Sequence, residues 1–235
     1  MPAEPNGIAG RCGLAAVAIL ALGTVSLRGF EDAYRPEQIE RWYYAATQQA
    51  DTTSLGAAFL SAGSLLLVPW AVGLARALGA YSWPGAALAA GAATVHASVA
   101  LLPFVVARMV PHGEAAIGIT LLGLTLSGAA LFGLSFGCGM LLLSLAMARS
   151  HAFPMWLSGS GLFASLLTMS AVCQAWSSVG ADLVAISAPA GLAWVAITSW
   201  KLQRLKWESW DHRRGAPELN RLPLAVPAEG VRGEE

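Results

Sequence analysis

The distribution of charged side chains constrains the fold of this chain more than any other feature. Across residues 52–200 the charged residues are Arg76, Arg108, Glu114, Arg149 and Asp182, and the other 23 of the 28 lie in segments 1–51 and 201–235. Charged residues make up 12% of the chain, about half the share usual in a soluble domain. A soluble helical protein needs polar helix faces to meet water, and the apolar runs offer none. The sequence predicts an integral membrane protein.

The apolar runs between these charges are long enough to cross a bilayer, which takes about 20 residues each. We expect an all-α polytopic membrane helix bundle with six transmembrane helices, at residues 8–27, 54–74, 84–106, 115–147, 154–176 and 181–200. The stretch ARSHAFPMWLSGSG then becomes the joint between the fourth and fifth helices. The fourth run is too long for one perpendicular crossing, so it is either tilted or projects beyond the bilayer.

The first run is expected to remain as a helix rather than to be cleaved as a signal peptide. Its basic start is weak, with Arg11 alone ahead of the apolar stretch. Cys12 precedes the apolar region instead of following it, which is the wrong order for a lipoprotein.

Basic residues near the helix ends predict the orientation, because cytoplasmic loops are enriched in Lys and Arg. Six crossings place both termini on one side, with eight basic residues: Arg11, Arg76, Arg149, Lys201, Arg204, Lys206, Arg213 and Arg214. The other side has four: Arg28, Arg35, Arg41 and Arg108. We expect a multi-pass membrane protein with N- and C-termini in the cytoplasm.

The large loop at residues 28–51 is predicted to hold a short external amphipathic helix between the first and second membrane helices. After Pro36, one helix face carries Ile39, Trp42, Tyr43, Ala46 and Ala50. Such a helix lies on the membrane surface. It either caps the bundle or serves as a ligand lid or docking element, in which case Trp42 and Tyr43 are candidate ligand-binding residues.

The C-terminal tail changes character along its length. The segment WKLQRLKWESWDHRR extends the last helix, and its Trp and basic residues suit anionic lipid headgroups. From Gly215 onward the apolar clusters disappear, which predicts a disordered cytoplasmic tail at residues 215–235 beside a transmembrane domain at 1–214.

The segment GLSFG, from Gly133 to Gly137, matches the nucleophile pattern of soluble hydrolases around Ser135. That pattern requires a strand, a tight turn and a helix, and here it lies inside one apolar helix. Rhomboid proteases place a serine on the fourth membrane helix, but their partner histidine on the sixth has no counterpart here. Gly133 and Gly137 form a GxxxG spacing, which predicts close helix packing.

His96 is the one titratable side chain predicted deep inside a membrane helix. Intramembrane ionisable residues are costly, so a functional role has to be considered. One interpretation is a neutral histidine bonded to Thr94, Ser98 or a hydroxyl of a neighbouring helix. The other is a proton or ligand contact, which makes His96 a candidate ligand-binding residue.

The sequence offers no candidate for catalysis, cofactor binding or metal binding. Cys12, Cys138 and Cys173 are widely separated and lack metal-ligand spacing. No nucleotide fingerprint or nucleic-acid motif is present, so we expect no cofactor and no nucleic-acid partner. Pro69, Pro103 and Pro189 are expected to kink three helices.

The C-terminal third carries a pattern that resembles a known family. An arginine and a proline precede the fifth helix, and a Trp–Leu pair and a glycine come after the proline. The last helix holds the pattern Pro–x–Gly–Leu–x–Trp. The matching residues are Arg149, Pro154, Trp156, Leu157, Gly161, Pro189, Gly191, Leu192 and Trp194. Over the last two helices the chain resembles a bacterial family of small multi-helix membrane proteins, the domain-of-unknown-function 4386 family. The resemblance implies a six- or seven-helix inner-membrane protein and no assigned activity.

Two classes of function are compatible with these features. The first is a non-enzymatic membrane subunit, scaffold, sensor or carrier of a small or lipidic ligand, whose partners are the lipid bilayer and other membrane proteins or further copies of the chain. The second is a membrane-embedded enzyme that acts on a lipid-phase substrate around His96. The absence of intramembrane acid–base pairs favours the first.

Overall fold

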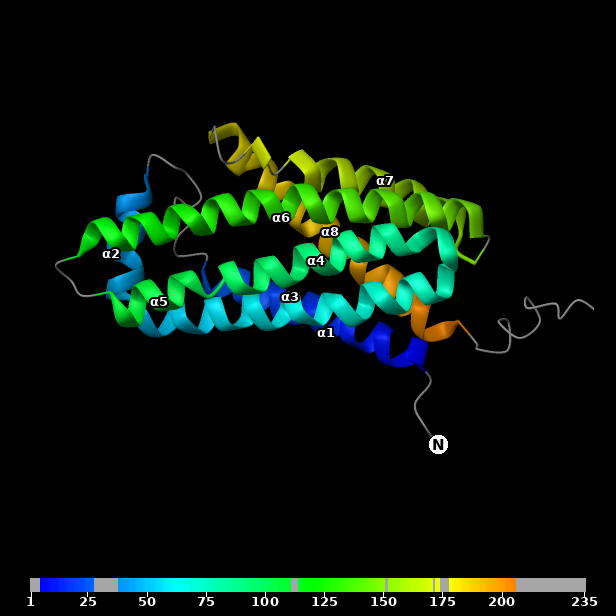
Figure 1. Ribbon diagram of the computed structural model, residues 1–235, viewed down its shortest axis with the longest axis horizontal. Helices are drawn as coiled ribbons and strands as arrows, with labels where there is room; N and C mark the ends of the chain where they lie inside the picture. The colour runs from blue at the N-terminus through cyan, green and yellow to red at the C-terminus, as the bar shows by residue number, and fades with distance from the viewer. Residues whose placement is uncertain are drawn as a thin grey trace, which may run out of the picture. The chain divides into compact units, whose positions relative to one another are not determined.

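The computed structural model describes residues 5–27, 38–110, 114–150, 152–170, 172–173 and 178–205, with side chains of the last segment from residue 186 onward. The regular elements in these residues are helices, and they belong to one compact unit, Met1–Arg204. In chain order the helices are α1 (Pro5–Ser26), α2 (Ile39–Gln48), α3 (Ala50–Leu78), the 3-10 turn η3 (Ala80–Ser82), α4 (Trp83–Val99), α5 (Leu102–Met109), α6 (Ala115–Ser150), α7 (Met155–Ser170) and α8 (Ser178–Arg204) (Figure 1).

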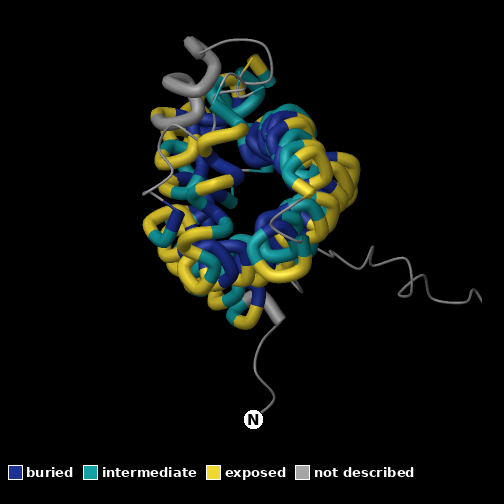
Figure 2. The backbone as a smooth tube through the Cα atoms, turned by 90° about the vertical axis from the view of Figure 1, so that its left-hand side faces the viewer, coloured by how far each residue is buried: buried dark blue, intermediate teal, exposed yellow. Residues whose placement is uncertain are grey.

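Six of these helices pack in a closed cycle. Each packs most extensively on two of the others, in the order α1, α3, α4, α6, α7, α8 and back to α1. Seen along the helices, buried positions face the interior of this cycle and exposed positions face outward (Figure 2). The outward positions include large apolar side chains such as Leu65, Leu131 and Phe163, which is the pattern expected of helices surrounded by lipid.

Four segments within the described residues are long and apolar enough to cross a membrane: Gly7–Ser26, Ala50–Leu78, Ala80–Met109 and Ala115–Ser150. They coincide with the first four predicted membrane helices. An all-helical fold compatible with an integral membrane protein is therefore confirmed. The fourth of these helices, α6, continues without a break over 36 residues, as the length of its apolar run predicted.

The predicted third helix, 84–106, is not continuous. It is divided into α4 and α5 around Ala100 and Leu101. Pro103 explains the break, because it has no N–H to donate to the carbonyl of Val99 and its ring collides with that carbonyl. The interruption lies where a kink at Pro103 was predicted, and α4 and α5 together still form one apolar segment, Ala80–Met109, that is long enough to cross a membrane.

The last two predicted spans also differ from the observed helices. The span 154–176 is helical as α7 only to Ser170, after which the described residues Val172 and Cys173 form a 3-10 turn. The span 181–200 is longer than predicted, since α8 runs from Ser178 to Arg204 with Pro189 inside it.

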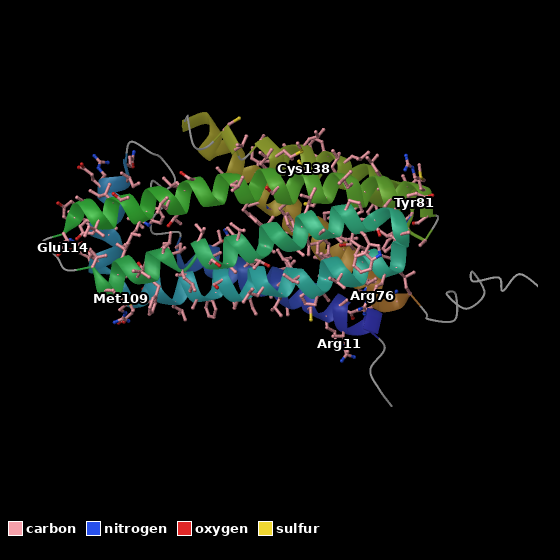
Figure 3. The ribbon with its side chains drawn as sticks, in the orientation of Figure 1. Arg11, Arg76, Tyr81, Met109, Glu114 and Cys138 are labelled. Atoms are coloured by element: carbon pink, nitrogen blue, oxygen red, sulfur yellow. The ribbon has the colours of Figure 1, made fainter. Side chains whose placement is uncertain are left out.

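The two ends of the helix bundle differ in composition (Figure 3). The end that carries Gln48, Met109 and Glu114 is called the α2 end. The opposite end, called the Gly79 end, carries the α3–α4 turn, where Gly79 adopts a φ of 90° that residues with side chains rarely adopt. The α6–α7 joint lies at the Gly79 end as well, with Pro154 directly before α7.

Helix α2 forms where the amphipathic pattern predicted it. Trp42, Tyr43 and Ala46 are buried, and the helix packs on α5 and α6. These residues share a cluster with Leu27, Val106, Leu122 and Leu126. The predicted apolar face is thus a packed face. The part of the loop at 28–37 and the tail at 206–235, including the predicted disordered segment, lie outside the described residues.

Candidate functional site

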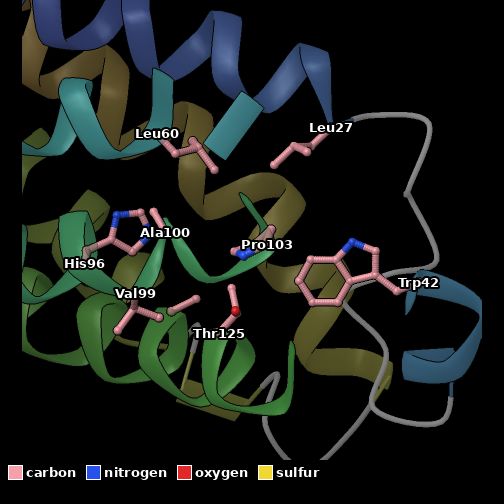
Figure 4. A pocket seen from close by; sticks show the side chains of 9 residues that line it. Leu27, Trp42, Leu60, His96, Val99, Ala100, Pro103 and Thr125 are labelled. Carbon is pink, nitrogen blue, oxygen red and sulfur yellow. The ribbon is translucent and has the colours of Figure 1, made fainter. Parts of the chain in front are cut away.

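A small cavity lies where α4 and α5 separate (Figure 4). Its volume is about 30 Å³. Its walls come from the end of α1, from α2, α3 and α6, and from the α4–α5 break: Leu27, Trp42, Leu60, His96, Val99, Ala100, Pro103, Thr125 and Ala129. A water molecule needs about 10–15 Å³ measured this way, so the cavity has room for about two. This is too little space for an organic substrate.

His96 lies on the α4 side of this cavity. Its Nδ1 is 2.8 Å from the hydroxyl of Ser64 on α3, so the predicted hydrogen bond to a neighbouring helix is present. Its ring stacks on Phe132 of α6, with 4.3 Å between centroids. Thr94 and Ser98, the other predicted partners, instead donate to the carbonyls of Ala90 and Thr94 in their own helix. His96 therefore ties α4 to both α3 and α6.

Trp42 approaches the same cavity from α2 (Figure 4). Its side chain is 4% exposed, so it closes the α2 side of the cavity rather than lying on a surface. Two of the three predicted ligand-binding residues, His96 and Trp42, are thus brought together although they are far apart in the sequence.

Tyr43, the third predicted ligand-binding residue, does not line the cavity. Its ring lies against α6 at Gly118, where an added Cβ would collide with the ring carbons. Its hydroxyl is buried and has no hydrogen-bond partner among the residues that the structure describes. The absence of a side chain at Gly118 is what allows the Tyr43 ring to pack so closely.

The glycines of GLSFG are both buried in α6. A Cβ at Gly137 would lie 2.9 Å from the Met169 nitrogen and 2.9 Å from the Ser165 carbonyl oxygen, both in α7. The predicted packing role therefore fits Gly137. Ser135 lies inside an unbroken α-helix, so the strand–turn–helix geometry of a hydrolase nucleophile is absent at this position.

A second close contact on α6 was not predicted. Gly139 faces α4, where an added Cβ would lie 2.8 Å from the Ala89 nitrogen and 2.9 Å from the Gly85 carbonyl oxygen. Gly85 meets α6 in return. The signal was present in the sequence as small residues on two helices, but nothing in the sequence paired those helices.

A row of rings in pairwise contact connects four of the helices in the cycle. It runs from His96 through Phe132 and Phe136 of α6 to Trp70 of α3 and Trp194 of α8. Successive centroids are 4.3 to 6.3 Å apart, within or close to the range in which aromatic pairs attract. Sequence reasoning missed this row, because its members come from four helices at unrelated spacings.

Three residues of the family-like pattern contact one another. The Trp194 indole nitrogen donates to the carbonyl of Leu157 across α7 and α8, at 3.1 Å. A Cβ at Gly161 would lie 2.5 Å from that same nitrogen. Gly161 thus leaves the space that Trp194 occupies, and this part of the pattern is a helix-packing arrangement.

One ion pair stands at the α2 end. Arg108 of α5 contacts the Asp51 carboxylate and donates from Nε to the Ser54 hydroxyl at 3.1 Å. Asp51 is 92% exposed, so the pair contributes little stability and mainly fixes α5 beside the start of α3.

The described residues hold no group of three His, Cys, Asp or Glu side chains able to bind a metal ion. Cys12 and Cys138 are free thiols. Of the four histidines, His96 is the one within the described residues; His112, His151 and His212 lie outside them, as do Gln174 and the side chain of Asp182. Comparison with protein-family models, with curated proteins and with solved structures found no match for this chain.

Proposed function

We propose that the protein is a six-crossing integral membrane protein that acts without covalent chemistry, as a subunit, scaffold or sensor within the bilayer. The observation that carries the proposal is the cavity at His96. It has room for about two water molecules, which is too little for an organic substrate. Among the described residues, His96 is the one titratable side chain that lines it, so the cavity supplies no acid–base pair.

The number of crossings rests on the cyclic packing. α7 packs on α6 and α8 packs on α1, and both α6 and α1 are long enough to cross a membrane. A helix of 16 residues such as α7 spans about 24 Å at 1.5 Å per residue, which is short for a bilayer core of about 30 Å. Local thinning of the bilayer accommodates such a mismatch at modest cost.

The orientation rests on the ends of the bundle. Among the described residues, the Gly79 end carries Arg11, Arg76, Arg149, Lys201 and Arg204, whereas the α2 end carries Arg41 and Arg108. The Gly79 end also has exposed aromatic side chains of the kind found at membrane interfaces: Tyr81, Trp83, Trp156 and Trp200. We place the Gly79 end and both termini in the cytoplasm of a bacterial cell, and α2 on the outer face of the inner membrane.

A scaffold or subunit is favoured over a channel because the buried rings of Trp70, Phe136 and Trp194 pack against one another between α3, α6 and α8. The outward apolar positions are available to lipid, to other membrane proteins or to further copies of the chain. We propose membership of the bacterial domain-of-unknown-function 4386 family from the sequence pattern, in which Leu157, Gly161 and Trp194 contact one another.

The test replaces His96 in the full-length protein. His96→Gln retains a donor and an acceptor, so the proposal expects a folded protein that complements whatever growth or fitness defect deletion of the gene produces. Folding is measured by size-exclusion chromatography and thermal unfolding in detergent, with Ser98→Ala on the exposed side of α4 as control. A folded His96→Gln protein that fails to complement would contradict the proposal.

That contrary result would favour the second candidate function, a membrane-embedded enzyme acting on a lipid-phase substrate. The observation in its favour is the convergence of Trp42 and His96 on one cavity. Glutamine cannot titrate, so an enzyme that uses His96 as acid or base would lose activity while keeping its fold.

A further inference from the structure

The Ser64 hydroxyl lies between two hydrogen-bonding groups. Its oxygen is 2.7 Å from the carbonyl oxygen of Leu60 and 2.8 Å from Nδ1 of His96. A hydroxyl has one proton to donate, so it donates to one of these atoms and not to both. The choice determines which nitrogen of the His96 ring carries a proton.

The other helices of this chain indicate to which of the two atoms the Ser64 hydroxyl donates. Hydroxyls inside helices repeatedly donate to the carbonyl four residues earlier, as at Thr24, Ser54, Thr94, Thr120, Thr125 and Ser127. Donation from Ser64 to Leu60 follows the same rule. The Ser64 oxygen then accepts a hydrogen bond from the Nδ1–H group of His96. Each polar hydrogen in the series His96–Ser64–Leu60 thus has an acceptor.

This arrangement leaves Nε2 of a neutral His96 without a proton. The imidazole ring is turned toward the cavity, with Ala100 and Pro103 beyond it (Figure 4). Nε2 is therefore a hydrogen-bond acceptor directed at the cavity. The Thr125 hydroxyl on the α6 wall donates its hydrogen to the carbonyl of Leu121, at 3.1 Å, so the Thr125 oxygen can only accept from a ligand in the cavity. The carbonyl of Val99 has lost its helical donor, because residue 103 is proline.

We propose that the cavity binds small neutral hydrogen-bond donors, namely a pair of water molecules that donate to His96 Nε2 and Thr125. The volume admits about two water molecules, and their O–H groups can donate to the two acceptors, His96 Nε2 and the Thr125 oxygen. Water is thus the ligand of the cavity in the proposed function. This assignment rests on that function, because it treats the cavity as a binding site and not as a catalytic one.

The experiment uses the full-length protein in lipid nanodiscs with 15N-labelled histidine. The four histidines give ring-nitrogen signals, and His96 is assigned by the signal lost in His96→Gln. At neutral pH we expect His96 Nδ1 to be of the protonated type and Nε2 of the unprotonated type, with magnetisation transfer from water protons to Nε2. Signals showing a proton on Nε2, or absence of transfer from water, would each overturn the proposal.

Two variants with matched controls sharpen the result. Ser64→Ala removes the acceptor for Nδ1–H, so the His96 proton should move to Nε2, whereas Ser61→Ala, buried one turn earlier on α3, should leave it on Nδ1. Thr125→Val removes one of the two acceptors that hold the water pair, so it should weaken the transfer from water, whereas Thr120→Val, exposed on the same helix, should leave it unchanged. Should Ser64→Ala fail to fold, the wild-type spectrum alone decides. These spectra are independent of complementation by His96→Gln, so the proposed function and this inference fail separately.

Discussion

Trp42 and Tyr43 are adjacent in α2, yet their side chains meet different surroundings. Trp42 lines the cavity, whereas Tyr43 packs on α6 where Gly118 leaves room for its ring. The amphipathic spacing predicted that both would be on the buried face. It could not predict their partners, because those depend on where a glycine of another helix lies. The partner of His96 is similar: a neighbouring hydroxyl was foreseen, but not that it would be Ser64.

Tyr43→Phe should stabilise the protein. The Tyr43 hydroxyl is buried without a hydrogen-bond partner among the described residues, and such a group costs about 1–3 kcal/mol. Removing it should raise the free energy of unfolding by about 1 kcal/mol, measured by thermal or denaturant unfolding in detergent. Tyr44→Phe, at an exposed position of the same helix, is the control and should have no effect. A destabilised Tyr43→Phe protein would mean that the hydroxyl has a partner.

At the scale of elements, α6 is the helix that organises its neighbours. Gly137 admits α7 and Gly139 admits α4, while its first turns support α2 through Gly118. The continuous helix was predictable because neither a charged residue nor a proline interrupts its apolar run at 115–147. The break between α4 and α5 was predictable only as a kink, because proline removes one donor but the packing of Pro103 and Val106 decides how far the helix opens.

Gly137→Ala should weaken the contact between α6 and α7. The added methyl group would lie 2.9 Å from two backbone atoms of α7, which cannot move independently, and overpacking of this kind costs about 1–3 kcal/mol. The measurement is the midpoint of thermal unfolding in detergent.

Gly91→Ala is the matched control for this change. Gly91 lies inside α4 with nothing within 4 Å of an added Cβ, so alanine should stabilise the helix by about 0.5–1 kcal/mol. Equal effects of the two substitutions would show that the α6–α7 contact is not close-packed at Gly137.

At the scale of the whole helix bundle, the sequence predicted the approximate positions of the four membrane-length apolar segments that the described residues contain, but not the cyclic order of the helices. Hydropathy identifies the apolar segments along the chain and their lengths. It does not identify which of these segments pack against one another. The contact of α1 with α8 depends on surfaces far apart in the sequence, such as Gly10 beside Ser199 and Gln203. The aromatic row is undetectable for the same reason.

Labelling of single cysteines in whole cells should reveal the orientation. In a variant without Cys12, Cys138 and Cys173, Gln48→Cys at the α2 end should react with a membrane-impermeant maleimide. Tyr81→Cys at the Gly79 end, where the native side chain is 84% exposed, should react only after the membrane is permeabilised. The excess of basic residues at the Gly79 end is the physical reason. Reaction of Tyr81→Cys in intact cells would reverse the proposed orientation.

The pairing of α1 with α8 has a consequence for biosynthesis. α1 is made long before α8, and at about 5–20 residues per second the ribosome needs roughly 10 to 30 seconds to reach α8. Throughout that interval the face of α1 that carries Gly10 and Gly13 lacks the Ser199 and Gln203 side chains that later cover it. Insertion machinery or lipid must shield that face, and a nascent chain halted before α8 would present it to any other helix in the membrane.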